Sequence, residues 1–231
     1  LICALAAGNH AMIKVSSSSH HFGYVLQNAL SEAFPQELVA VVTGGGVISD
    51  TFSHLAFDKL VFTGSTNVGK TVMKAAAENL VPVILELGGK SPVVVHPSID
   101  LNVVAERVAF GKLWNAGQTC VAPDYLYLPR GKTAEFIRCY KAVVKSMYPS
   151  LKDNPDYTSI INDKQNRRLQ GYLDDALKNG AQSVEVNPRN EDLTAVRKLA
   201  PTILTGVTAD MEIMKNEIFG PILPILEYDQ I

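Results

Sequence analysis

Residues 59–89 read KLVFTGSTNVGKTVMKAAAENLVPVILELGG, and this stretch decides the fold. Its two ends, 59–63 and 82–87, are short runs rich in Val, Ile, Leu, Phe and Thr, which is typical of buried strands. Between them, residues 68–79 have the spacing of a helix. A strand, a helix and a second strand of these lengths form a βαβ unit, whose strands lie parallel and whose crossover is right-handed.

The same alternation of strands and helices extends towards the N-terminus. The spacing predicts strands at 11–15 and 38–43 and helices at 20–34 and 50–56. Repeated βαβ units of this kind predict an α/β fold with a parallel, doubly wound sheet.

Beyond Ser91 the pattern changes, and a second α/β region is expected. Asp100 is a favourable N-cap for a long helix that is predicted to run through Trp114. The other elements predicted in this region are a strand within PVVVHP, helices at 133–147 and 164–178, and strands at 202–204 and 222–226. The Gly-rich turn at 88–92 is therefore the expected boundary between a first domain, 1–90, and a second domain, 91–231.

Composition excludes several classes of protein. The 231 residues are 47% hydrophobic and 19% charged, which allows a sizeable core and excludes a disordered chain. The net charge of −2 provides no basic surplus for nucleic acid. The longest apolar stretches, such as 38–42, are far shorter than the roughly 20 residues of a membrane span. Three widely spaced cysteines (Cys3, Cys120, Cys139) fit neither a disulfide framework nor a metal site, so we expect a cytoplasmic location.

Both ends of the chain are also informative. The sequence opens at Leu1 inside a pattern, LICALAAGNHAMIKV, without an initiator Met. It stops at LEYDQI, directly after an apolar run. We therefore expect an internal fragment of a longer protein.

One motif supports a nucleotide-triphosphate hypothesis. Residues 64–71, GSTNVGKT, match the P-loop pattern G-x-x-x-x-G-K-[ST] between a predicted strand and a predicted helix. In a P-loop, Lys70 would contact the outer phosphates and Thr71 would hold magnesium. An NTPase also needs an acidic residue at the end of a separate strand, and the one candidate, Glu86, is close in sequence. A tight glycine turn at a helix N-terminus explains the same residues, and both interpretations favour an anion.

Four segments together point elsewhere. They are FTGSTNVGK at 62–70, LELGGKSP at 85–92, NAGQTCVAPDY at 115–125 and NEIFGPILP at 216–224. In this order they resemble the aldehyde dehydrogenase superfamily, and GQTC–VAPDY with EIFGPILP is most similar to its class 3 branch of coniferyl- and fatty-aldehyde dehydrogenases. The resemblance implies a partial NAD(P)-binding domain with a Rossmann-like parallel sheet over 1–90. It also implies a partial α/β catalytic domain of the aldehyde dehydrogenase fold over 91–231.

By this resemblance Cys120 is the nucleophile, and its thiolate attacks an aldehyde carbonyl to form a thiohemiacetal. A free thiol with a pKa near 8.5 is only a few per cent thiolate at neutral pH, so its surroundings must activate it. The small and polar residues at 117–119 are expected to form a turn that exposes the sulfur. Cys3 and Cys139 lie in apolar or helical patterns and are expected to be buried and inert.

Glu86 corresponds to the general base that activates water to hydrolyse the thioester. Its neighbours Ile84, Leu85 and Leu87 are apolar, so desolvation is expected to raise its pKa towards the useful range. The alternative for Glu86 is a strand-end carboxylate that faces solvent or pairs with a nearby Lys.

The resemblance also implies a site for NAD or NADP. Its residues would be Lys14, Ser17, Gly64, Ser65, Gly69, Leu87, Glu217 and Phe219. Ser65 would contact a cofactor phosphate, and Glu217 would accept the hydroxyls of the nicotinamide ribose. The family commonly reads Lys-Pro-Ser-Glu from Lys14 onward, whereas Ser17 replaces the acid that repels a 2′-phosphate, so NADP is expected to be tolerated beside NAD.

The expected function is the oxidation of a small-molecule aldehyde to its acid, with coniferyl-like aromatic and medium-chain aliphatic aldehydes both open as substrates. A homodimer is expected for the full-length protein. The asparagine of the family's oxyanion hole would precede Leu1, and loss of such a donor costs roughly 10²–10³ in rate, so the fragment itself is expected to be inactive. A P-loop module and a catalytically dead relative that retains only the fold are the alternatives.

Overall fold

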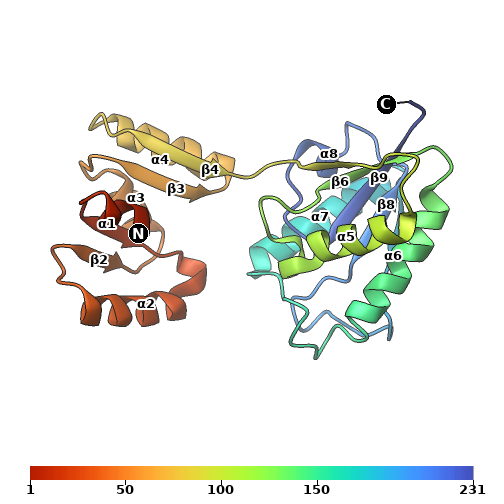
Figure 1. The fold of residues 1–231 in the computed structure, drawn as a ribbon, viewed down its shortest axis with the longest axis horizontal. Helices are drawn as coiled ribbons and strands as arrows, with labels where there is room; N and C mark the ends of the chain where they lie inside the picture. The colour runs from red at the N-terminus through yellow and green to blue at the C-terminus, as the bar shows by residue number, and fades with distance from the viewer. Residues whose placement is uncertain (231) are drawn as a thin grey trace. The chain divides into compact units, whose positions relative to one another are not determined.

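A computed structural model describes residues 1–230, which form two compact units (Figure 1). The first unit is Leu1–Leu87 and the second begins at Gly88. The first unit contains, in chain order, α1 (Ile2–Ala6), β1 (Ala11–Lys14), a 3₁₀ turn (Ser17–Ser19), α2 (His20–Ala33), β2 (Val39–Val42), α3 (Gly46–Ser53), β3 (Leu60–Gly64), α4 (Thr66–Ala77) and β4 (Val83–Leu87).

All four strands of the first unit pair in parallel, as the βαβ pattern predicts. Strand β1 pairs with β2, which places Lys14 beside Val42. Strand β3 pairs with β4, which places Gly64 beside Leu87. Within the described chain these are two separate two-stranded sheets, whereas the periodicity had suggested one sheet. The carboxyl ends of both pairs carry residues of the expected cofactor site.

Helix α4 covers one face of the β3–β4 pair. Leu60 of β3 and Val72 of α4 are buried together with Ala76 and Val81. The other face is open, because strand alternation points Val61 outward and leaves it 65% exposed.

The second unit is built on a five-stranded sheet (Figure 1). Its elements are β5 (Pro92–Val94), α5 (Leu101–Leu113), a 3₁₀ segment (Trp114–Gly117), β6 (Tyr125–Pro129), α6 (Thr133–Met147), α7 (Asp163–Lys178), β7 (Gln182–Glu185), β8 (Thr202–Thr205), α8 (Glu212–Lys215) and β9 (Ile222–Tyr228). The strand order is β5-β6-β9-β8-β7, and only the edge strand β7 runs antiparallel to its neighbour.

Helices cover both faces of this sheet. Val108 of α5 and Phe136 of α6 belong to one core cluster, and Leu169 of α7 belongs to a second. The central strand β9 is buried over its first four residues, which explains why its sequence is a continuous apolar run. The buried sheet thus fixes the positions of the loops at its edge.

Several element boundaries differ from the sequence-based expectations for local reasons. Helix α5 begins after Asp100, whose carboxylate caps it as expected, but the helix ends at Leu113 because a strained turn follows. Helix α3 begins at Gly46, four residues before the expected start. Strands β6 and β7 were not predicted.

The longest helix of the described chain, α7, has 16 residues. A bilayer span needs about 20 apolar residues. No helix within residues 1–230 combines that length with sufficient apolar character. The same residues contain no group of three or more His, Cys, Asp or Glu side chains placed to hold a metal ion.

Candidate active site

A strained turn precedes Cys120. Asn115, Ala116 and Gly117 have φ values of +56°, +51° and +75°. This left-handed region is costly for Asn and Ala, so the surrounding structure must impose it. The Cys120 side chain is exposed just beyond the turn. An accessible sulfur after a rigid turn is what a nucleophile requires.

Hydrogen bonds of the Gln118 side chain stabilise this turn. Its amide donates to the backbone oxygens of Asn115 at 3.2 Å and Ser159 at 3.1 Å. Its carbonyl oxygen accepts the backbone N–H of Ile161 at 2.9 Å. The side-chain amide of Asn115 donates to the backbone oxygen of Gln118 at 3.1 Å. The turn is therefore fixed to a loop about 40 residues further along the chain.

Gly117 brings the turn against a distant segment. A Cβ atom on Gly117 would lie 2.3 Å from the backbone oxygen of Gly220. The neighbouring Phe219 is half-buried and has a φ of +48°, which is unusual for a bulky residue. Two strained segments therefore pack directly on each other.

Glu217 lies on the Gly88–Gly89 turn. The Gly89 N–H donates to Glu217 Oε1 at 3.2 Å, and a Cβ on Gly88 would approach Oε2 to 1.9 Å. Desolvation raises the pKa of Glu217, as does the Asp124 charge, while the Gly89 bond and nearby cations lower it. A glycine is thus required at position 88 for this carboxylate to sit where it does.

Three of the four motifs meet in the second unit. A Cβ on Gly89 would lie 3.6 Å from the backbone oxygen of Cys120, while the Gly89 N–H binds Glu217. The Gly-Gly turn therefore lies against both the loop that contains Cys120 and the segment that contains Glu217 and Phe219.

A cavity of about 320 Å³ lies beside the strained turn. It is lined by Trp114, Asn115, Thr119 and Thr158. The Trp114 ring stacks on Phe110, with ring centroids 6.1 Å apart, and both rings are largely exposed. Phe110 was not among the predicted site residues. Its position four residues before Trp114 is the signal that could have indicated it, because residues at i and i+4 share one face of a helix.

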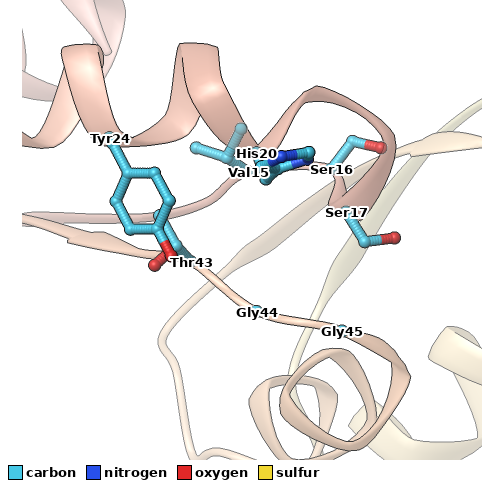
Figure 2. Close-up of a pocket in the computed structure, with 8 residues that line it drawn as sticks. All are labelled: Val15, Ser16, Ser17, His20, Tyr24, Thr43, Gly44 and Gly45. Atoms are coloured by element: carbon cyan, nitrogen blue, oxygen red, sulfur yellow. The ribbon is translucent and has the colours of Figure 1, made fainter.

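In the first unit, a cavity of about 220 Å³ lies at the carboxyl ends of β1 and β2 (Figure 2). Ser17 lines it together with the segment Thr43-Gly44-Gly45 and residues of α2. Figure 2 shows the Tyr24 ring reaching from α2 towards Thr43. Lys14 ends β1 and is half-buried, but it is not among the lining residues.

The glycine turn after β3 does not form a P-loop. Helix α4 begins at Thr66, and the Ser65 Oγ caps it by accepting the Val68 N–H at 3.5 Å. Gly69 is already helical, and its N–H bonds to the Ser65 carbonyl oxygen. The backbone N–H groups that a P-loop uses as a phosphate cradle are thus partly consumed within the helix. The nucleotide-triphosphate hypothesis is not supported.

Gly69 has a packing role instead. A Cβ at this position would lie 2.7 Å from Leu87 Cδ2, so glycine lets α4 approach β4 closely. The structure brings these two predicted cofactor residues together, with Gly64 beside Leu87 in the sheet.

Two expectations about side-chain environment were wrong. Glu86 is exposed, because strand alternation places it on the solvent-facing side of β4 with Ile84, while Leu85 and Leu87 point the other way. Its apolar neighbours therefore do not desolvate it. Cys3 is exposed as well, because α1 buries none of its residues, whereas Cys139 is buried as expected.

Lys112 is fully buried at the end of α5. Its pKa is lowered from 10.5 to about 8, mainly by burial and to a smaller extent by the charge of Lys90, while Asp124 and Glu217 oppose the shift. Below pH 8 the side chain is charged in both the folded and the unfolded chain, so the folded state bears the full desolvation cost. Between pH 8 and 10.5 Lys112 is protonated in the unfolded chain but not in the folded chain. The free energy of unfolding therefore increases as pH rises through this range.

Lys112→Met is therefore expected to stabilise the full-length protein at pH 7, by at most about 3 kcal/mol. Asp124 keeps its ion pair with Lys90, so no buried carboxylate is left unpaired. The variant should also lose the rise in stability above pH 8. Thermal unfolding between pH 7 and 10 measures both effects, with Lys145→Met on the exposed face of α6 as control. A lower unfolding temperature for Lys112→Met at pH 7 would contradict this account.

Comparison with known proteins gives matches over the whole chain. The model of the aldehyde dehydrogenase family matches residues 1–231. The chain is 52% identical over 228 residues to a probable coniferyl aldehyde dehydrogenase of Pseudomonas aeruginosa, covering 99% of the chain and 47% of that protein. It is 41% identical over 227 residues to aldehyde dehydrogenase family 3 member A2 of Mus musculus, covering 98% and 45%. The chain thus spans about half the length of the curated relatives it matches.

Solved structures give the same result. The substrate-bound state of Staphylococcus aureus AldH matches with a TM-score of 0.90 and 42% identity, covering 99% of the chain and 49% of that structure. Mycobacterium tuberculosis aldehyde dehydrogenase complexed with NAD⁺ matches with a TM-score of 0.86 and 31% identity, covering 98% and 48%. The chain therefore belongs to the aldehyde dehydrogenase family.

Proposed function

We propose that the full-length protein containing this chain oxidises an aldehyde to its carboxylic acid. The observation that carries the proposal is the exposed Cys120 on a rigid turn, with Gly89 beside the Cys120 backbone and Glu217 bound to Gly89. This arrangement gives a sulfur nucleophile a fixed direction of attack.

In the proposed reaction Cys120 acts first as the nucleophile and later as the leaving group. Its thiolate forms a carbon–sulfur bond to the carbonyl carbon, which gives a thiohemiacetal. Loss of a hydride from this adduct gives a thioester, and a nicotinamide cofactor, when bound, would supply the hydride acceptor. Glu86 then removes a proton from the water that attacks the thioester carbonyl. The carbon–sulfur bond breaks, which releases the acid and the Cys120 thiolate, and Glu86 passes its proton to solvent.

Each unit, considered by itself, has features that support dinucleotide binding. The cavity beside Ser17 opens at the carboxyl ends of parallel strands, where such folds bind nucleotides, and its size suits part of a dinucleotide. Ser65 stands at the N-terminus of α4, which favours a phosphate. Glu217 offers a carboxylate for ribose hydroxyls, and Phe219 is the proposed neighbour of the nicotinamide ring. The related Mycobacterium tuberculosis enzyme is described as a complex with NAD⁺.

The Ser17 side chain sets an expectation for cofactor choice. Because Ser17 is exposed and uncharged, a 2′-phosphate meets no like charge there, and NADP should be used beside NAD. Ser17→Glu is expected to weaken NADP use by about 10-fold or more while leaving NAD use nearly unchanged. Steady-state titration with both cofactors measures this. A wild-type preference for NAD of a hundredfold or more would contradict it.

For the substrate we propose an aromatic aldehyde of the coniferyl type. Similar proteins are named coniferyl aldehyde dehydrogenases, and the stacked Phe110–Trp114 pair presents aromatic surface beside the cavity next to the strained turn. The test is a comparison of coniferyl aldehyde with octanal, following reduced cofactor by absorbance. Higher kcat/KM for coniferyl aldehyde supports the proposal, and a preference for octanal contradicts this choice of substrate while leaving the reaction class intact.

The proposed activity belongs to the full-length protein, because the chain spans about half of its relatives. The 231 residues alone are expected to show little or no aldehyde turnover. Robust turnover by that polypeptide would contradict this expectation. The homodimer and the cytoplasmic location suggested by the sequence remain predictions.

A further inference from the structure

An ion pair holds the backbone on both sides of Glu217. The Lys90 ammonium donates to the carbonyl oxygen of Asn216 at 3.0 Å. The Asp124 carboxylate accepts the backbone N–H of Ile218 at 2.9 Å. Lys90 and Asp124 also bind each other at 2.5 Å. The residues immediately before and after Glu217 are therefore tied to a single pair of charges.

This ion pair is well shielded from water. Asp124 is only 3% exposed, and the Lys90 side chain is 22% exposed. Lys90 also donates to the carbonyl oxygen of Ile213 at 2.7 Å and lies over the Tyr125 ring. In such surroundings charged hydrogen bonds are strong and directional, and loss of one partner leaves the other unsatisfied.

The pair also joins the three motif segments of the second unit. Lys90 directly follows the Gly88–Gly89 turn, and Asp124 lies four residues after Cys120. The backbone that both residues grip belongs to the segment of Glu217. A shift of any one segment would therefore be transmitted to the other two through these bonds.

Arg168 of α7 completes the hold on this segment. Its guanidinium donates to the carbonyl oxygens of Glu217 at 3.2 Å and Ile218 at 2.8 Å. Its own position is set by Gln165, which accepts from Nε at 2.6 Å, and by stacking over the Tyr172 ring. Lys90, Asp124 and Arg168 are called here the Glu217 bracket.

The bracket leaves the carboxylate itself available. Among the described residues, the hydrogen bond to the Glu217 carboxylate is donated by the Gly89 N–H to Oε1, and Oε2 receives none. We propose that the Glu217 bracket positions this carboxylate for the dinucleotide, so that Lys90, Asp124 and Arg168 act on cofactor binding only through Glu217. The inference rests on the proposed function, in which Glu217 binds the ribose.

A double-mutant cycle in the full-length protein tests the bracket. Asp124→Asn and Arg168→Met are each expected to raise the Kd for NAD about 10-fold, the usual scale for lost bonds to charged groups, and Glu217→Gln should do the same. In the Glu217→Gln background, Asp124→Asn should add less than a twofold loss, because its effect passes through Glu217. The KM for aldehyde should stay within twofold.

The matched control is Glu135→Gln, which breaks the exposed Lys132–Glu135 pair on α6 and should leave NAD binding unchanged. A purely structural role for Asp124 predicts that the single effects multiply in the double variant. If Asp124→Asn does not fold, the same cycle is run with Arg168→Met, because Arg168 is only half-buried and its substitution is better tolerated.

The outcomes separate the inference from the proposed function. If Glu217→Gln binds NAD as tightly as wild type, both the role of Glu217 and the bracket are wrong. If Glu217→Gln binds weakly but the bracket variants bind normally, or their effects multiply with it, the bracket alone is overturned. Non-additive losses confirm it.

Discussion

Cys120→Ala in the full-length protein is expected to lower kcat/KM for aldehyde oxidation by a factor on the order of 10⁴ or more, the scale seen when a covalent nucleophile is removed. Alanine cannot form the carbon–sulfur bond, so neither hydride loss from a thiohemiacetal nor thioester hydrolysis can occur. Because Cys120 is exposed, the substitution opens no large cavity, and folding should be unaffected.

The other two cysteines provide the controls for this prediction. Cys3→Ala changes an exposed residue of α1, and Cys139→Ala changes a buried residue of α6. Both variants should retain activity within a few-fold, and Cys139→Ala should lower the unfolding temperature slightly. Activity retained in Cys120→Ala, or lost in Cys3→Ala, would contradict the assignment of the nucleophile.

Gly117→Ala is expected to produce the largest loss of stability, on the order of 3 kcal/mol or more. Two costs add: the methyl group would lie 2.3 Å from the backbone oxygen of Gly220, and the φ of +75° disfavours any side chain. The oxygen is backbone, so relief requires movement of the nucleophile loop or of the Phe219 segment. Activity should therefore fall together with the unfolding temperature, measured by thermal or denaturant unfolding.

Gly131 offers a matched control for Gly117→Ala. Its φ is +79°, nearly the same as that of Gly117, but a Cβ there would meet nothing within 4 Å. Gly131→Ala should therefore cost only about 1 kcal/mol, the backbone part of the effect. Equal destabilisation by the two substitutions would show that the contact with Gly220 does not matter.

The local elements of the fold follow from sequence periodicity. Helix α6 matches its predicted residues, and the βαβ pattern correctly predicts parallel pairing of β3 with β4. Which strands share a sheet could not be predicted, because hydrogen bonding between distant strands leaves no periodic signal. Strand β6, YLYLP, was not predicted, and its first residue, Tyr125, is also the last residue of the NAGQTCVAPDY motif.

The site is harder to predict than the fold. The motifs predict which residues belong to the candidate site. The structure brings Cys120 and Glu217 together through Gly89, which lies beside the Cys120 backbone and binds Glu217. The strain at Ala116 has no signal in its residue type, because it is imposed by contacts such as that of Gly117 with Gly220. Neither is there a local signal for the Lys90–Asp124 pair, whose members are 34 residues apart.

Exposure of side chains is predicted least well. The expectation for Glu86 considered apolar neighbours in sequence, whereas in a strand the adjacent residues face the opposite side of the sheet. The neighbours that count for burial are those at i±2 and on other elements. The role proposed for Glu86 therefore depends on its access to water.

The central claim is that Cys120 carries the acyl group during turnover, and trapping that group tests it most directly. Full-length Glu86→Gln, in which thioester hydrolysis should be slow, is mixed with aldehyde and NAD, quenched with acid, digested and examined by peptide mass spectrometry. We expect one acyl group on the peptide that contains Cys120, formed together with one equivalent of reduced cofactor. Continued production of reduced cofactor with Cys120 unmodified, or an acyl group on Cys3 or Cys139 instead, would contradict the account.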